Sequence, residues 1–498
     1  MQVTRVRYWL GGIILAIISI VARAETLQPD PAWQQGKLNN GFSWQVLTTP
    51  QRPSDRVQIR LVINTGSLAE SPQQLGFSHL LPRIALLEST RLDSAQLRTL
   101  WQQGIDPDRP HPPAITSYDY TLYSYSLANN RPETIKEAFN WLAGTAGDIK
   151  ISVETASLAL HTTDPVASWP ANPGDAWWRY RLKGSTLSGH DPRAAISGAV
   201  DIEKLKAFYH QWYTPDAMTL YVVGNVDGRA VSEQISKVFS SLEGKREMPL
   251  PLPVLPALGK EPVVLSNDGL AQGRLSLVWD SAWQPLRDAR ALQHYWKSDL
   301  VREALFTYLQ KKFSENKIQN VQLGFDCRVF YQRAQCAINL DAEPSAFSNH
   351  LKLIAQEMES LRDNGVSQTF FDELIARKTA ELSKLFATYA RMDTEVLMNQ
   401  RLRSQQNAVV DIAPEQYQKL RQHFLAELTR NKLNQELQQQ LTQVLTLVLL
   451  QADDGKGVSV APLQTIWQSV MAPVESPAPT VEETKPEAVE ISPVQKGA

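Results

Sequence analysis

The side chains that come closest to a catalytic arrangement lie near residues 80 and 160. His79 and Arg83 are four residues apart in a stretch with helical spacing of apolar residues, so both fall on one helix face. Histidine can bind a metal or carry a proton, whereas arginine stays protonated and has no lone pair for a metal. Pro82, between them, accepts no proton. This stretch therefore offers one ligand or base, His79, beside a fixed positive charge.

Other catalytic devices are incomplete or missing in the sequence. His161 and Asp164 are three residues apart at the end of an expected helix, and they form either a polar dyad or a chance pair. The chain contains no His-Glu-x-x-His, no Gly-x-Ser-x-Gly and no Walker loop, and neither cysteine has a suitable base nearby. The residues alone therefore do not assemble a complete active site.

Strands and helices alternate around these residues. A strand is expected at 57–64, a helix at 72–87 carries His79, and a helix at 153–162 carries Glu154 and His161. The first half has further expected helices at 132–143, 202–213 and 229–242 and a strand at 218–223. The second half has expected strands at 275–279 and 444–450, a hairpin at 323–340, and helices at 298–313, 351–362, 368–388, 393–405 and 415–443. The pattern predicts an α/β fold of the α+β sandwich type, with sheets backed by helices.

The expected hairpin brings the two cysteines together. Pairing Val329 with Ala334 places Cys327 opposite Cys336 and puts the neighbouring apolar residues on one face. An oxidising compartment favours a disulfide between them, and two buried thiols are the alternative. The turn at Tyr331-Gln332 lacks the Asn-Gly type of signal that fixes a register.

The first 24 residues predict export. Arg5 and Arg7 precede a mainly apolar run from residue 9 to 22, closed by Ala22-Arg23-Ala24, as in a secretory signal peptide cleaved after Ala24. A membrane anchor is the alternative, but the run is shorter than the roughly 20 residues that span a bilayer. We therefore expect a periplasmic protein with no membrane attachment after cleavage. The net charge of −2 gives no field that favours nucleic acid.

Length and composition divide the rest of the chain. With 498 residues, the chain is long enough for two to four domains. Residues 248–256 are rich in proline and predict a stiff linker between domains at 25–247 and 257–470. Residues 471–498 are rich in proline and glutamate and predict a disordered acidic tail.

Several segments, taken in order, resemble the pitrilysin (insulinase) family of zinc peptidases. The resemblance covers most of residues 36–450 and rests on Leu38-Asn39-Asn40-Gly41, Asn64-Thr65-Gly66-Ser67-Leu68-Ala69-Glu70, Gly76-Phe77-Ser78-His79-Leu80-Leu81-Pro82-Arg83, Gly189-His190-Asp191-Pro192, the segments 208–218 and 222–227, and Gly365-Val366-Ser367 with Glu373-Leu374. It implies two pitrilysin-like domains that face each other across a cleft.

The family's zinc motif, His-x-x-Glu-His on one helix with a carboxylate on another, is degenerate here. The resemblance places His79 at the first ligand, Pro82 at the base and Arg83 at the second ligand, while Glu154 and His161 occupy the family's Glu-x6-Glu positions. Two histidines are fewer than the three protein ligands usual at catalytic zinc. We therefore expect no metal, with His79 and His161 as weak candidates. We also hypothesise that Arg83 replaces the zinc charge and pairs with Glu154, the alternative being a solvated arginine.

The resemblance leaves three functions open. The first is a non-catalytic peptidase homologue, without a cofactor, that binds peptides or a partner protein in the cleft. The second is a zinc metallopeptidase completed by Asp164 or Glu88, or by a partner chain. The third is a structural subunit of an assembly, as a homo- or heterodimer. In some two-chain relatives a zinc-less chain supplies an Arg and a Tyr, and the candidate pairs are Arg328 with Tyr331 and Arg391 with Tyr389.

Overall fold

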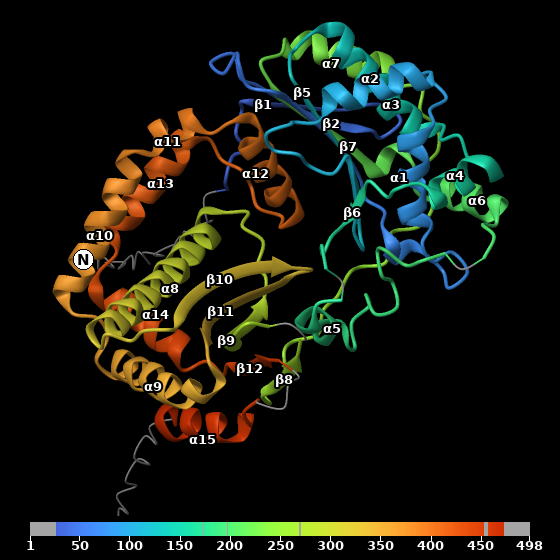
Figure 1. Ribbon diagram of the computed structural model, residues 1–498. Helices are drawn as coiled ribbons and strands as arrows, with labels where there is room; N and C mark the ends of the chain where they lie inside the picture. The colour runs from blue at the N-terminus through green and yellow to red at the C-terminus, as the bar shows by residue number, and fades with distance from the viewer. Residues whose placement is uncertain (1–25, 173, 197, 268–269, 453–456, 473–498) are drawn as a thin grey trace, which may run out of the picture.

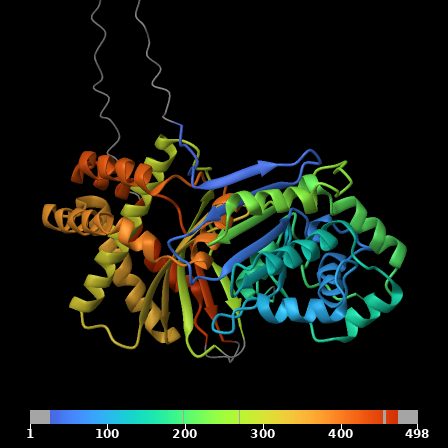
Figure 2. The ribbon, with the colours of Figure 1, turned by 90° about the horizontal axis from the view of Figure 1, so that it is seen from above.

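A computed structural model describes residues 26–172, 174–196, 198–267, 270–452 and 457–472 (Figure 1). The predicted signal peptide (1–24) and residues 473–498 of the predicted tail lie outside the described residues. The chain forms two sheets, and in Figures 1 and 2 the helices of each half lie mainly on its outer side. The predicted fold class is confirmed.

The first half builds a seven-stranded sheet in the order β1-β2-β7-β3-β5-β4-β6. Pairs β2/β7 and β4/β6 are parallel, and the others are antiparallel. The strands are β1 (Trp33–Lys37), β2 (Ser43–Thr48), β3 (Val57–Ile63), β4 (Ala114–Thr116), β5 (Thr121–Leu127), β6 (Val166–Ser168) and β7 (Met218–Gly224). The helices are α1 (Phe77–Leu87), α2 (Ser94–Gly104), α3 (Pro132–Gly147), α4 (Val153–His161), α5 (Ala176–Leu182), α6 (Ile202–Trp212) and α7 (Gly228–Phe239).

The second half builds a five-stranded sheet in the order β10-β11-β9-β12-β8, in which only β12/β8 is parallel. The strands are β8 (Val263–Ser266), β9 (Gly273–Ala282), β10 (Gln322–Phe330), β11 (Arg333–Ala342) and β12 (Thr446–Gln451). The helices are α8 (Ala289–Glu315), α9 (Phe347–Asn364), α10 (Gln368–Ser383), α11 (Leu385–Arg391), α12 (Thr394–Gln406), α13 (Pro414–Glu427), α14 (Arg430–Leu441) and α15 (Val460–Met471). Among the described residues, no helix is long and apolar enough to cross a membrane.

The central strand β3 shows how the first core forms. Every second residue from Val57 to Ile63 is buried among apolar side chains from the helices. Gln58 and Arg60 on the opposite face are also buried, and they donate hydrogen bonds to Ser126 and to the carbonyl of Tyr125. The face of β3 that carries Gln58 and Arg60 is also shielded from solvent, because α12 from the second half packs over β7 and β3.

The two halves exchange segments. Leu27 lies in the core of the second half, and the Asp30 N–H donates to the carbonyl of Asp411. In the other direction, Leu397 and Met398 of α12 pack against Trp33 and other residues of the first sheet. Figure 1 shows α12 beside the first sheet. The domain boundaries expected from the sequence remain predictions, and packing crosses them at residues 26–30 and at α12.

The hairpin β10–β11 has the expected register, with Cys327 opposite Cys336, and a disulfide joins the two residues. Its turn residues Tyr331 and Gln332 both have positive φ, 42° and 64°. A two-residue turn of this kind matches the twist of the strands, although the sequence carries neither Gly nor Asn there.

Several expected boundaries were wrong. The helix expected from residue 72 begins at Phe77, because Gly76 has a φ of 88° and ends the preceding turn. The helix expected at 415–443 is two helices, since Thr429 starts α14 as an N-cap. The helix expected from 298 begins nine residues earlier, where Asp288 caps α8. Helices α2, α5 and α15 were not expected.

Candidate functional site: the degenerate metal motif

A buried carboxylate sets the start of the helix that carries His79. Glu70 accepts hydrogen bonds from the N–H groups of Gly76 at 3.0 Å and Ser78 at 2.6 Å, which are free donors at the beginning of α1. Burial raises the pKa of Glu70 to about 7, although these two N–H groups oppose the rise. The cap fixes the end of α1 and so the position of His79.

Pro82 lies inside α1, and the helix continues through it. Proline has no N–H, so the carbonyl of Ser78, four residues earlier, loses its helical partner. The hydroxyl of Thr116 on β4 donates to that carbonyl at 3.5 Å. A hydroxyl of a neighbouring strand thus takes the place of the lost helical bond.

His79 is paired with Asp164 and not with a second histidine. Its Nε2 lies 2.7 Å from Oδ2 of Asp164, and Nη1 of Arg83 lies 3.6 Å from the same oxygen. Arg83 also donates to the carbonyl of Thr162 at 3.1 Å. One histidine, one arginine and one aspartate therefore form a mutually paired set at the family's metal position.

The protonation states follow from burial and from these contacts. Burial lowers the pKa of His79, against the opposing effect of its hydrogen bond to Asp164. For Asp164, burial raises the pKa, but the hydrogen bonds from His79 and the Val166 N–H and the charge of Arg83 hold it below its usual range. A neutral His79 thus donates through Nε2 to a charged carboxylate, and its buried Nδ1 has no hydrogen-bond partner among the described residues.

The structure does not bring the other motif positions into this set. Glu154 lies exposed in the first turn of α4, where the Ser152 hydroxyl lowers its pKa. His161 is exposed, with its Nδ1 2.7 Å from the carbonyl of Ser157. The hypothesis of an Arg83–Glu154 pair is wrong, because Arg83 reaches the chain just after α4 and pairs with Asp164. The dyad of His161 with Asp164 is also absent from the described contacts.

The remaining sequence candidates have structural partners. Glu88 pairs with Lys150 at 2.9 Å. Arg328 pairs with Asp326 at 3.2 Å and is exposed, whereas its suggested partner Tyr331 is half-buried at the hairpin tip. The Tyr331 hydroxyl lies 3.2 Å from that of Ser117 in the first half.

The second Arg and Tyr candidates lie in α11. The carbonyl of Tyr389 accepts a hydrogen bond from Arg52, whose guanidinium also lies 5.5 Å from the centre of the Tyr389 ring. Tyr389 and Tyr331 therefore each hold the halves together, and neither lies in the set around His79.

These residues do not fit a zinc ion. A catalytic zinc needs about three protein ligands and an open position. Here the one well-placed histidine is bound to Asp164, and a guanidinium stands at the second ligand position, where its charge repels a cation. Within the described ranges, no group of three or more His, Cys, Asp or Glu side chains could hold a metal.

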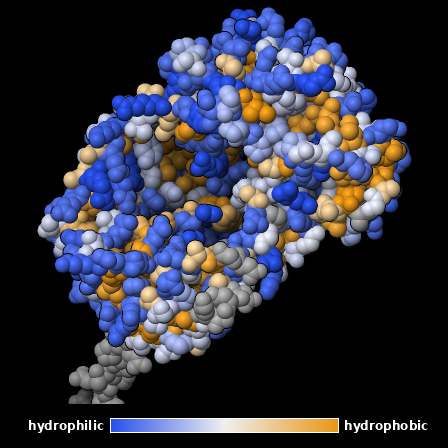
Figure 3. All heavy atoms as spheres, in the orientation of Figure 1, coloured by the Kyte–Doolittle hydropathy of each residue, from blue (hydrophilic) through white to orange (hydrophobic). Residues whose placement is uncertain are grey.

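A cleft lies between the halves. Figure 3 shows the surface hollowed over the region where Figure 1 places α12 and the hairpin. One cavity of about 300 Å³ is lined by β1 and β2 on one side and by α11 to α13 on the other, including Trp33, Leu47, Tyr389, Arg401 and Tyr417.

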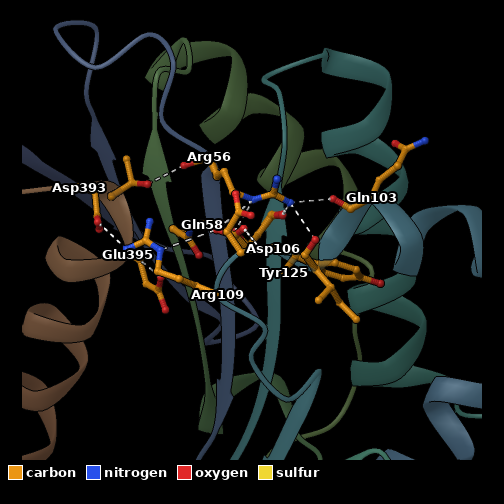
Figure 4. Close-up of polar contacts among 12 residues, drawn as sticks. Arg56, Gln58, Gln103, Asp106, Arg109, Tyr125, Asp393 and Glu395 are labelled. Atoms are coloured by element: carbon orange, nitrogen blue, oxygen red, sulfur yellow. Dashed lines mark hydrogen bonds and ion pairs between the residues drawn. The ribbon is translucent and has the colours of Figure 1, made fainter.

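Polar contacts join the start of α12 to the first half (Figure 4). Arg109 lies 2.7 Å from Asp393, the N-cap of α12, and 3.6 Å from Glu395. The Thr394 hydroxyl donates to the carbonyl of Arg56 at 2.6 Å. These contacts attach the start of α12 to the edge of the first core.

Comparison with known proteins identifies the family. The sequence model of the family "Insulinase (Peptidase family M16)" matches residues 45–158, and that of the family "Peptidase M16 inactive domain" matches residues 199–378. The chain is 53% identical over 498 residues to "Protein YhjJ" of Escherichia coli K12, covering 99% of this chain and 100% of that protein. The chain belongs to peptidase family M16. This confirms the resemblance seen in the sequence.

Solved structures of M16 proteins share the fold. A "predicted insulinase family protease" from Yersinia pestis has a TM-score of 0.89 and 57% identity, covering 93% of this chain and 100% of its own. The first half of the periplasmic protease PqqL from Escherichia coli has a TM-score of 0.75 and 18% identity, covering 91% of this chain and 99% of that one. At 18% identity the second likeness shows the fold alone.

Sequence reasoning missed the role of Asp164 as the partner of His79. The only signal in the sequence is a carboxylate just after the helix that faces α1, and the sequence alone suggests Asp164 as a replacement ligand or as a dyad partner of His161. It also missed Glu70, which lay inside a family segment without an assigned role.

Proposed function

We propose that this M16 peptidase homologue is non-catalytic and binds extended peptides, or an extended segment of a partner protein, in the cleft between its halves. One observation carries the proposal. At the metal position, Asp164 pairs with both His79 and Arg83, so the side chains that would hold zinc and its water instead satisfy one another.

The chemistry of hydrolysis has no substitute among these residues. Peptide hydrolysis by this family's mechanism needs a metal-activated water and a base beside it. The base position is Pro82, and the neutral His79 already donates to Asp164. Binding does not need these groups, because extended peptides pair with the backbone of exposed strands.

The cleft supports binding. Its cavity of about 300 Å³ is lined by β1 and β2 of the first sheet and by α11 to α13 of the second half, and its volume is at the lower end of the size of ligand pockets. Aromatic and apolar side chains such as Trp33, Leu47 and Tyr417 line it beside Arg401. A few charged groups among apolar walls are typical of sites that select by shape and orientation.

We also propose a periplasmic location. The signal-like residues 1–24 and the likeness to the periplasmic protease PqqL of Escherichia coli support it.

The test is a pair of measurements on untagged mature protein. Metal content is expected to be far below one zinc per chain, and fluorescent peptides are expected to bind without cleavage, with the same affinity in chelator. His79→Ala should leave binding unchanged. One zinc per chain that is lost in His79→Ala, together with chelator-sensitive cleavage, would establish the alternative, a zinc metallopeptidase with a non-standard site.

A further inference from the structure

The disulfide of the second half lies at the base of the hairpin tip and is open to solvent. Cys327 on β10 and Cys336 on β11 face each other and are bonded. Cys327 is exposed and Cys336 is half-buried. Because β10 ends its sheet, no neighbouring strand in the part of the chain that the structure describes covers Cys327 from that side. An exposed disulfide is open to attack by a dissolved thiol while the protein stays folded, unlike one inside a core.

The disulfide borders a positively charged cavity. This cavity of about 220 Å³ lies between the hairpin and α8, and its lining includes both cysteines, Arg302 and Arg328. Within the described ranges, the lining contains no Asp or Glu. Arg328 is paired with Asp326, so Arg302 is the main source of charge. A neighbouring cation favours a thiolate over a thiol, and this helps both an attacking thiolate and a departing one.

Two nearby carboxylates do not cancel the charge of Arg302. Asp299 lies 3.6 Å from Arg302, but its side chain is 51% exposed, where water screens the pair. Glu436 lines an adjoining cavity of about 340 Å³ together with Arg302 and Cys336, but Lys297 binds its carboxylate at 2.8 Å. The buried Nε of Arg302 has no hydrogen-bond partner among the described residues. A positive charge therefore remains on the side of the disulfide that carries Cys336.

The disulfide also closes the loop that joins the two halves. The bonded cysteines are 9 positions apart, and the hairpin tip lies between them. At the tip, the rings of Phe330 and Tyr331 pack against Trp169 and Trp178 of the first half, and the Tyr331 hydroxyl lies 3.2 Å from that of Ser117. A covalent link at the base of a short loop restricts how far the loop can open. The bond therefore supports the contact between the halves without lying in that contact.

We propose that the Cys327–Cys336 disulfide is a thiol–disulfide exchange site, and that its reduction loosens the hairpin tip and with it the contact between the halves. The reductant is a small anionic thiol. Its thiolate attacks the sulfur of Cys327 and forms a mixed disulfide, and the electron pair of the broken S–S bond leaves on Cys336 as a thiolate.

A second thiolate completes the reduction. It attacks the reductant's sulfur in the mixed disulfide and releases Cys327 as a thiolate. Two molecules of the small thiol thus become one disulfide, two electrons pass to the protein, and the protons lost by the reductant are available to the two cysteines. The inference does not depend on what the cleft binds.

The first experiment locates the attack. Untagged mature protein, kept folded as judged by circular dichroism, is incubated with excess glutathione. N-ethylmaleimide is then added to trap every free thiol, and peptides are mapped by mass spectrometry without reduction. We expect glutathione on Cys327 and maleimide on Cys336. The opposite placement, or a reduction that is only as fast as global unfolding, would overturn the exchange site.

The second experiment tests the charge in the cavity. Arg302→Gln should slow the reaction with glutathione by about fivefold, whereas Arg302→Lys, which keeps the charge, should stay within about twofold of wild type. Raising the salt concentration should narrow the difference between wild type and Arg302→Gln. Arg229→Gln removes the same charge from the exposed surface of α7 and serves as the control. Equal rates for Arg302→Gln and Arg229→Gln would overturn the role of Arg302.

The third experiment measures the hairpin tip. Amide hydrogen exchange of residues 328–335 is compared in oxidised protein and in protein reduced with dithiothreitol, with strand β3 as the internal reference. Reduction should speed exchange at the tip by about tenfold or more and leave β3 unchanged. The variant with both Cys327→Ser and Cys336→Ser should behave like reduced wild type with or without dithiothreitol. A complete reduction that changes exchange at the tip by less than about twofold would overturn the switch.

Discussion

Replacing Asp164 by Asn tests whether the paired set around His79 is a structural substitute for the metal site. The change keeps the shape of the side chain but removes the charge that faces Arg83 at 3.6 Å and His79 at 2.7 Å. Hydrogen bonds to charged groups contribute about 1.5–3 kcal/mol, and the partly exposed position of Asp164 places the expected loss near 2 kcal/mol. For a half of this size, the melting temperature should fall by about 4–8 °C.

The pH dependence of this loss has a defined sign. The pKa of Asp164 is lowered in the folded state, so its stabilisation is present above the unfolded value of 3.8 and disappears as pH falls through the folded pKa. The pKa of His79 is lowered from 6.5, so folding favours the neutral ring and acid also weakens this site. The difference between wild type and Asp164→Asn should therefore be full at pH 7 and shrink below pH 4.

The assay is thermal unfolding followed by circular dichroism at pH 7 and at about pH 3.5, with Glu88→Gln as the control. Glu88 has a similar ion pair, with Lys150 at 2.9 Å, but the Lys150 side chain is 55% exposed, and pairs with an exposed partner contribute under about 1 kcal/mol. An Asp164→Asn protein as stable as Glu88→Gln at pH 7 would refute the reasoning. So would an NMR titration in which His79 protonates above pH 6.5.

Three further changes probe other parts of the molecule. Tyr331→Ala should destabilise the closed arrangement of the halves by about 3–5 kcal/mol, while Tyr331→Phe, which loses only the contact with Ser117, should cost about 1 kcal/mol. Limited proteolysis and solution scattering will measure both variants. Equal behaviour of the two would contradict the packing role of the Tyr331 ring. The pKa of Glu70 is raised to about 7, so its contribution to stability is full below pH 4.5 and is lost as pH rises through 7. The free energy of unfolding should fall by about 3 kcal/mol over this range. Glu70→Gln should flatten this part of the plot of stability against pH, and an unchanged plot would disprove the role of Glu70. Replacing both cysteines by Ser opens a loop with a sequence separation of 9 and should lower the free energy of unfolding by about 2–3 kcal/mol. Wild type in reductant should be as stable as this variant. If the variant and the oxidised wild type are equally stable, the disulfide does not form.

Local pattern was sufficient for much of the fold. The strand at β3, the buried strand β7 and the hairpin register followed from period-two burial and from opposed apolar residues. The edge strands β1 and β6 did not, because β1 is mainly polar and β6 has three residues. Helix α15 was also not predicted from the sequence, because it lies beside a segment whose composition predicts disorder.

The candidate site was only partly accessible from sequence. His79, Pro82 and Arg83 share one helix, so their relation follows from spacing alone. Their partner was assigned wrongly, because spacing within α4 does not tell which end of that helix faces α1. The structure shows that Arg83 reaches Thr162 and Asp164, just beyond its C-terminal end. Contacts that depend on how two helices meet need the tertiary fold.

The same geometry limits how a metal site could be regained. Substituting Arg83 alone would leave Asp164 bound to His79 through the nitrogen that presently donates, with Pro82 still at the base position. Substituting Asp164 alone would leave the guanidinium of Arg83, whose side chain is 13% exposed, without its counter-ion beside His79. Each single change therefore weakens the pairing without creating three ligands. The set around His79 is stable as a unit because every member neutralises or orients another. For this reason we assign a structural role to helix α1, and we assign binding to the cleft and its strand edges.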